Sequence, residues 1–115
     1  MNVARVAKLG LSQATLDKLN SVFKQHSNID LVLIYGSRAK GNYRPGSDID
    51  LTIKGSALEF AELMQIDDQI DDLLLPYTVD LSQYDQLTDA GLISHIDRVG
   101  VVIYNRRTDL EEKSL

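Results

Sequence analysis

The stretch LVLIYGSRAKGNYRPGSDIDLTI, residues 31–53, decides how this chain folds. It begins at 31–35 with an apolar, partly β-branched run that has the length and composition of a buried strand. Gly36 and Ser37 end that run, and a short basic segment follows them. After a polar loop, residues 48–53 alternate polar and apolar side chains, which predicts a second, half-buried strand.

The second strand carries two carboxylates on one face. Asp48 and Asp50 are two residues apart, so their side chains project from the same side of a strand. Carboxylates this close repel, and a divalent cation or protonation of one of them relieves the repulsion. Mg²⁺ prefers oxygen ligands and completes its coordination with water and phosphate oxygens. The pair therefore predicts a magnesium site; the alternative is the solvated face of an edge strand.

The turn before the basic segment is suited to an anion. Gly36 lets the backbone approach a ligand closely, and Ser37 offers a hydroxyl and, if a helix begins there, free N–H groups. Arg38 and Lys40 are candidates to neutralise a triphosphate, and in a helix only one of the two would face it. The alternative is an ordinary strand-to-helix turn with a serine cap. The turn and the acid pair together suit a nucleoside triphosphate bound with magnesium.

These residues resemble the signature of a known family. Gly36 to Gly41, followed after a loop by Ser47 to Leu51, is similar to the motif of the polymerase-β nucleotidyltransferase superfamily. The likeness is greatest to the minimal nucleotidyltransferases, which are stand-alone domains of about this size. The resemblance implies an α/β (α+β) nucleotidyltransferase fold, a small mixed sheet of about four strands with helices packed on one side. The residues that it implies for nucleotide and phosphate binding are Gly36, Ser37, Arg38, Lys40 and Ser47.

A third carboxylate follows on the next predicted strand. Residues 77–82 alternate again, with Thr78, Asp80 and Ser82 on one face. In the resembling family an acid on the strand beside the acid pair completes a catalytic triad, and Asp80 matches it by position. The resemblance thus implies that Asp48, Asp50 and Asp80 hold the metal, with Asp80 acting as or assisting the general base. The alternative is a turn aspartate at a strand end.

The resemblance also implies an activity. The chain would be a nucleotidyltransferase that uses one or two Mg²⁺ ions and transfers AMP from ATP, or the equivalent group of another nucleoside triphosphate, to a hydroxyl. Minimal nucleotidyltransferases often work as antitoxins beside a helical HEPN-domain toxin and modify a toxin tyrosine. One alternative is a non-catalytic module that neutralises its partner by contact. Another is a small-molecule nucleotidyltransferase, of the aminoglycoside-modifying kind, with a substrate site supplied by another subunit.

The rest of the chain is expected to build the scaffold. We predict helices at 13–26, 57–75 and 87–98, a last strand at 100–104, and loose ends at 1–10 and 106–115 of a single domain, 1–115. His95 lies beside the apolar stripe of the last helix, where we interpret it as a hydrogen-bonded packing residue, with contact to the site as the alternative. We interpret the acidic run Asp67, Asp68, Asp71 and Asp72 as the solvated face of a helix or part of a surface for a basic partner.

Composition narrows the classes of function. The formal net charge is −5, which argues against a broad electrostatic grip on nucleic acid. The chain has no cysteine, so disulfides and cysteine-ligated zinc are excluded. No apolar run approaches the length of a membrane span, and we expect a cytoplasmic protein. The nucleotide, the acceptor, the number of groups transferred, the need for a partner and the oligomeric state, homodimer included, are not readable from the sequence.

Overall fold

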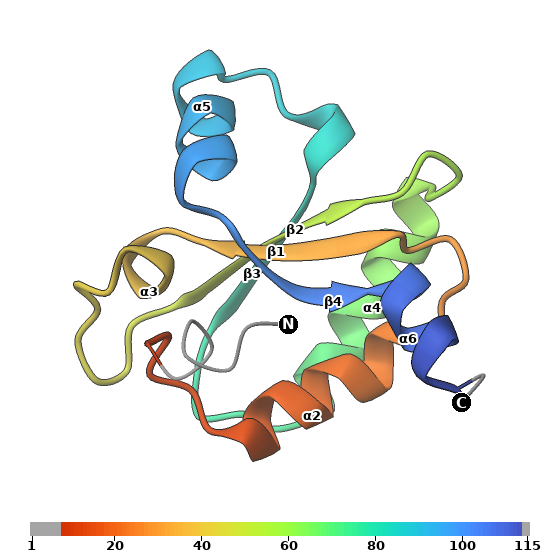
Figure 1. Cartoon of the computed structure of the whole chain (residues 1–115), viewed down its shortest axis with the longest axis horizontal. Helices are drawn as coiled ribbons and strands as arrows, with labels where there is room; N and C mark the ends of the chain where they lie inside the picture. Colours follow the sequence, from red (N-terminus) through yellow and green to blue (C-terminus); the bar gives the residue numbers. More distant parts are fainter. Residues whose placement is uncertain (1–7, 114–115) are drawn as a thin grey trace.

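The computed structural model describes residues 8–113, which form a four-stranded mixed sheet with helices over both faces (Figure 1). The strands are β1 (Leu31–Tyr35), β2 (Ile49–Lys54), β3 (Val79–Gln83) and β4 (Val101–Asn105). Their order is β3-β2-β1-β4; β1 pairs antiparallel with β2 and β4, whereas β2 and β3 are parallel. The helices are α2 (Gln13–Phe23), α3 (Ser37–Lys40), α4 (Phe60–Asp71), α5 (Ala90–Val99) and α6 (Arg106–Lys113), with a 3₁₀ turn, η1, at Tyr84–Gln86. The predicted α/β fold with a small mixed sheet is confirmed.

The sheet separates two apolar clusters. Under one face, α2 and α4 pack on the inward side chains of the strands, among them Ile49, Leu51 and Ile53 of β2. Over the other face, Ile96 of α5 packs on Leu33 and Tyr35 of β1. The expected packing of helices on one side therefore holds for α2 and α4, while α5 covers the opposite face (Figure 1). The reason lies in β1, whose unbroken apolar run must be covered on both faces.

The predicted helices are present with shorter bounds. Ser12 caps α2, since its hydroxyl accepts a hydrogen bond from the Thr15 N–H at 3.1 Å. The predicted helix at 57–75 is limited to α4, because the chain tightens after Asp71 and Leu74 takes a left-handed conformation (φ 53°). Pro76 follows and disfavours helix in the residue before it. The helix ends before Pro76, as predicted, but about one turn earlier than the apolar pattern indicated.

Both expected loose ends differ from the structure where it describes them. Leu9 is 1% exposed and belongs to the core beneath the sheet. Residues 106–113 form α6, which begins where Asn105 Oδ1 accepts the N–H groups of Arg107 and Thr108. Residues 1–7 and 114–115 lie outside the described part of the chain. None of the described helices combines the length and apolarity needed to cross a membrane.

Candidate active site

Three aspartates lie on the face of the sheet that α5 covers in part. The inward packing of Ile49 and Leu51 turns Asp50 toward the opposite face, and Asp48 directly precedes β2. In the parallel pairing of β2 and β3, Asp80 lies opposite Asp50. Burial raises the pKa of Asp50, and the charges of Asp80 and Asp48 raise it further. The structure therefore brings the three predicted acids close enough to interact.

Gly36 joins the predicted phosphate turn to these acids. The residue links β1 to α3 with φ 76° and ψ −153°, in the half of conformational space that favours glycine. A Cβ atom at this position would overlap Oδ2 of Asp50. Ser37, half-buried, begins α3 directly after it. The absence of a side chain at Gly36 thus allows the turn and the Asp50 carboxylate to be in contact.

The structure contradicts the expectation that Arg38 faces a phosphate. Its side chain is 2% exposed, and its guanidinium donates to the carbonyl oxygens of Leu9, Gly10 and Ser47. The guanidinium also lies over two aromatic rings, with its Cζ 5.1 Å from the centroid of Tyr43 and 4.8 Å from that of Tyr77. Because four of its donor contacts go to backbone carbonyl oxygens, Arg38 links the segment at Leu9 and Gly10 to the loop at Ser47. Its charge is therefore not presented to a ligand.

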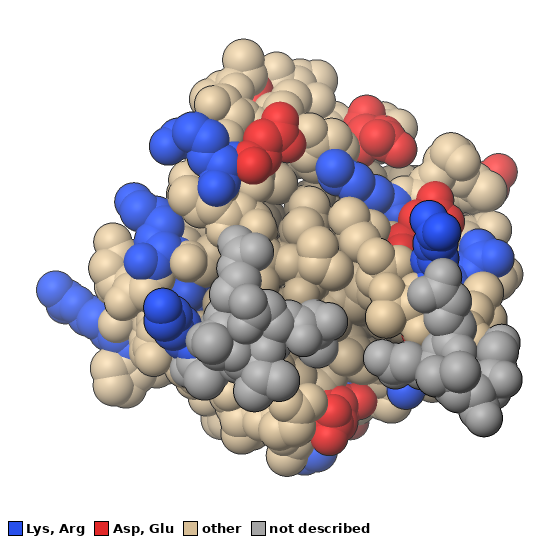
Figure 2. All heavy atoms as spheres, in the orientation of Figure 1, with Lys and Arg blue, Asp and Glu red and all other residues tan. Residues whose placement is uncertain are grey.

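Lys40 and Ser47 have different surroundings. Lys40, two residues after Arg38 on α3, is exposed, so of these two cations Lys40 is the one that a ligand could reach. Figure 2 shows Lys and Arg side chains gathered on the side of the molecule where α3 and the loop after it lie. Ser47 Oγ accepts the N–H of Arg44 at 2.8 Å, and its carbonyl oxygen accepts from Arg38. In this structure Ser47 orders the loop before Asp48, and phosphate contact by Ser47 or Lys40 stays a prediction.

Two further residues lie at the site. His95 of α5 accepts the Gly36 N–H through Nε2 at 3.1 Å, so its two sequence interpretations, hydrogen-bonded packing and contact with the site, both apply. Its ring lies edge-on to Tyr35, with centroids 6.2 Å apart. Burial raises the pKa of Tyr35, the charges of Asp80 and Asp50 add to this, and a hydrogen bond with Ser82 opposes it. The sequence did not indicate a site role for Tyr35, because this residue ends an apolar run that is typical of a buried strand.

The donor set fits a divalent cation. Asp48, Asp50 and Asp80 offer hard oxygen ligands on one side of the sheet, and Asp50 is at present destabilised by its like-charged neighbours. Among the described side chains, the acids whose carboxylate oxygens all lie within 4.8 Å of one another are a different group, Asp67, Asp68 and Asp71 of α4. Two of that group are exposed, as expected for the solvated face of a helix, and exposure alone assigns them no ligand.

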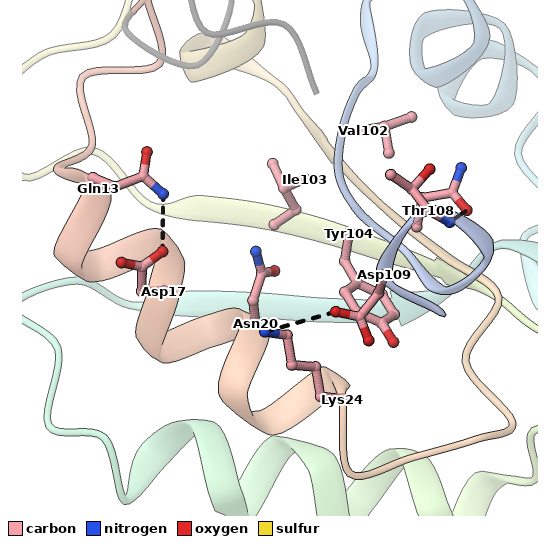
Figure 3. A pocket seen from close by; sticks show the side chains of 10 residues that line it. Gln13, Asp17, Asn20, Lys24, Val102, Ile103, Tyr104, Thr108 and Asp109 are labelled. Atoms are coloured by element: carbon pink, nitrogen blue, oxygen red, sulfur yellow. Dashed lines mark hydrogen bonds and ion pairs between the residues drawn. The ribbon is translucent and has the colours of Figure 1, made fainter. Parts of the chain in front are cut away.

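A pocket of about 420 Å³ opens away from the acids, between α2, β4 and α6 (Figure 3). Asp17, Lys24 and Thr108 are among its lining residues, and Lys24 forms an ion pair with Asp109 at 3.7 Å. Within it, the Asn20 Oδ1 atom is buried without a hydrogen-bond partner among the described residues. None of the predicted site residues lines this pocket, so it is separate from the candidate active site.

Comparisons with known proteins agree with this fold. The family model described as polymerase beta, nucleotidyltransferase, matches residues 17–109. The fold is similar to a chain from a toxin–antitoxin complex with AMP-PNP (18% identity, TM-score 0.64, covering 84% of this chain and 77% of that one). It is also similar to a chain from a tri-AMPylated Shewanella oneidensis HEPN toxin in complex with MNT antitoxin (16% identity, TM-score 0.62, covering 88% and 78%). A putative nucleotidyltransferase from Sulfolobus solfataricus is similar as well (20% identity, TM-score 0.52, covering 90% and 85%). No curated protein sequence matches significantly.

Proposed function

The chain belongs to the polymerase-β nucleotidyltransferase family, and we propose that it transfers AMP from ATP to a hydroxyl of a protein partner. The observation that carries the proposal is the contact between the Gly36 turn and the carboxylate of Asp50, which has Asp80 opposite and Asp48 beside it. Phosphate groups need N–H and hydroxyl donors, and the metal that accompanies them needs carboxylates. The turn and the acids offer these two kinds of group side by side.

The residues divide the work as follows. The β- and γ-phosphates would rest on the Gly36–Ser37 turn, where Ser37 would supply the N–H and hydroxyl donors because the Gly36 N–H donates to His95. Exposed Lys40 would neutralise part of their charge. Asp48, Asp50 and Asp80 would hold Mg²⁺, which when bound supplies charge stabilisation at the attacking and leaving oxygens. A carboxylate oxygen of Asp80 would accept the proton of the attacking hydroxyl. The hydroxyl oxygen bonds to the α-phosphorus, the bond from that phosphorus to the bridging oxygen breaks, and pyrophosphate leaves.

The acceptor and partner are proposed from the structural neighbours and the sequence resemblance. Two of the neighbours are described as toxin–antitoxin complexes, one of them with AMP-PNP and one with an AMPylated HEPN toxin. We therefore propose a HEPN-domain toxin as partner and one of its tyrosines as acceptor, with this chain acting in the cytoplasm as the antitoxin.

Intact-mass analysis tests the proposal directly. The chain is incubated with ATP, Mg²⁺ and the helical partner encoded beside it, and both proteins are weighed. We expect the partner to gain one or more AMP units, and the double variant Asp48→Asn, Asp50→Asn to give no gain. The matched control, Asp68→Asn with Asp71→Asn, removes the same charge from exposed positions on α4 and should transfer normally.

The alternative of neutralisation by contact predicts a different pattern. In that case a stable complex forms, neither protein changes mass with any nucleoside triphosphate, and protection from the toxin survives in the Asp48/Asp50 double variant. That combination would overturn the proposed transferase.

A further inference from the structure

The N–H of Gly36 is held by a side chain 59 residues further along the chain, His95 of α5. We propose that His95 is a positioning residue, which holds the Gly36–Ser37 turn in the conformation that binds a triphosphate. The inference rests on the proposed function in taking this turn as the triphosphate site. It adds that α5, outside every motif in the sequence, sets the strength of that binding.

Gly36 is restrained on three sides. His95 Nε2 accepts its N–H at 3.1 Å, its carbonyl oxygen accepts the Lys40 N–H at 3.1 Å, and the Asp50 carboxylate lies against its Cα. The carbonyl contact belongs to α3, and the carboxylate contact is a close approach without a hydrogen bond. Among the described residues, His95 therefore supplies the hydrogen bond that reaches the turn from another layer. Glycine has more backbone freedom to lose than any other residue, and without this bond a ligand would have to order the turn on binding.

The position of His95 is itself fixed by packing. Its neighbour Ile96 is 1% exposed in the cluster with Leu33 and Tyr35, which docks α5 on β1. The His95 ring stands edge-on to Tyr35 at an interplanar angle of 80°, so the imidazole cannot rotate freely over the strand. Because Nε2 accepts a hydrogen bond, the proton of the neutral ring is on Nδ1. The imidazole is therefore held as an acceptor aimed at the turn.

Two substitutions of similar size separate this role from simple packing. In His95→Gln the side-chain amide oxygen can reach the place of Nε2, so the acceptor is kept. In His95→Asn the amide oxygen stops near the place of Nδ1, so Gly36 loses its acceptor while the site stays polar. Ser94→Ala, at an exposed position on the same helix, is the control for general effects of changing α5.

The experiment measures binding without requiring transfer. Inorganic tripolyphosphate with Mg²⁺ is titrated into the full chain by calorimetry, and the amide resonance of Gly36 is followed by NMR. Losing one hydrogen bond that preorganises the turn should weaken binding about tenfold in His95→Asn. His95→Gln should stay within about threefold of the unaltered chain, and Ser94→Ala should be unchanged. In transfer assays the effect of His95→Asn should fall on KM for ATP, with kcat largely preserved.

Several outcomes would overturn the inference. Equal affinity in His95→Asn and the unaltered chain, with the Gly36 resonance shifted, would mean that the bond forms but does not position the turn. Equal loss in His95→Asn and His95→Gln would mean that the imidazole ring, not its acceptor, matters. If the unaltered chain does not bind tripolyphosphate, the Gly36–Ser37 turn is not a triphosphate site. If instead the binding pattern is as expected but no acceptor gains a nucleotide, the proposed function fails and the inference about His95 stands.

Discussion

Asp50 and Asp80 lie directly opposite each other in the parallel pairing of β2 and β3. Directly opposed like charges destabilise a sheet, and this pair is neighboured by a third carboxylate, that of Asp48. The scaffold therefore tolerates a repulsion that a bound cation would relieve. We therefore predict that removing one of these charges raises the stability of the metal-free fold and lowers the transfer activity.

Asp50→Asn should abolish transfer and stabilise the metal-free fold. Removing one charge of the group lowers transfer by about a hundredfold or more, because metal-supplied charge stabilisation is lost. The same change removes the repulsion from Asp80 and Asp48, so the melting temperature without metal should rise at neutral pH. Activity assays and thermal unfolding in EDTA measure the two effects. A variant with lower stability than the unaltered chain would contradict the prediction.

The pH dependence of the free energy of unfolding should reflect the raised pKa of Asp50. Its pKa is raised in the folded state by burial and by Asp80 and Asp48, so between the unfolded and folded pKa values the native state binds more protons. The free energy of unfolding then falls as pH rises from about 4 through that window. Denaturant unfolding across this range, without metal, should show the decline in the unaltered chain and a smaller one in Asp50→Asn. Added Mg²⁺ should recover stability at neutral pH only where Asp50 is present.

Gly36→Ala should disturb the acids more than the fold. The new Cβ would overlap Asp50 Oδ2 and would also sit at φ 76°. Gly41→Ala provides a matched control, because φ there is 83° and no atom lies within 4 Å of the new Cβ. Both variants should lose about 1 kcal/mol of stability from backbone strain. Transfer activity should fall by about tenfold or more only in Gly36→Ala, and equal losses in both variants would rule out the Asp50 contact as the cause.

Arg38→Lys should affect stability far more than nucleotide affinity. A lysine ammonium cannot reproduce the hydrogen bonds that the guanidinium donates to the carbonyl oxygens of Leu9, Gly10 and Ser47. It also cannot reproduce the contacts of the planar guanidinium with two tyrosine rings. We expect a loss of about 2–3 kcal/mol in the free energy of unfolding. Arg44→Lys, at an exposed position, is the control. A stable Arg38→Lys chain that no longer binds ATP would restore the phosphate role.

Lys40→Ala should raise KM for ATP without destabilising the chain. The side chain is exposed beside the turn, so its loss removes charge near the triphosphate but no buried contact. We expect an increase of about fivefold that shrinks at high salt, as for an exposed charge contact. Lys18→Ala, an exposed lysine on α2 under the opposite face, should leave KM unchanged. Initial-rate measurements at two ionic strengths make the comparison.

Local periodicity explains what the sequence could predict. Alternation with period two assigns Asp50 and Asp80 to the face opposite the apolar residues, and the structure has both on that face. The turn at Gly36 follows from the break in an apolar run. Because each of these signals is contained in a few consecutive residues, none required knowledge of the rest of the chain.

Contacts between distant segments explain what was missed. Arg38 donates to Leu9 and Gly10, 29 and 28 residues away, and its charge alone does not indicate its direction. His95 reaches Gly36 only because α5 crosses to the second face of the sheet. An apolar stripe indicates that a helix packs, but not on which face. The sequence thus predicted the site residues that the strands position. It did not predict contacts that depend on how distant segments pack together.

The burial of Arg38 also bears on how such motifs are selected. Within six residues, the chain has a glycine and a serine in the turn beside Asp50, an exposed lysine and a buried arginine. A mutation at the turn or the lysine would alter a predicted ligand contact, and a mutation of the arginine would remove hydrogen bonds that order the supporting loops. Natural selection would preserve both kinds for different reasons, so an invariant residue in a nucleotide-binding signature is not by itself a nucleotide ligand.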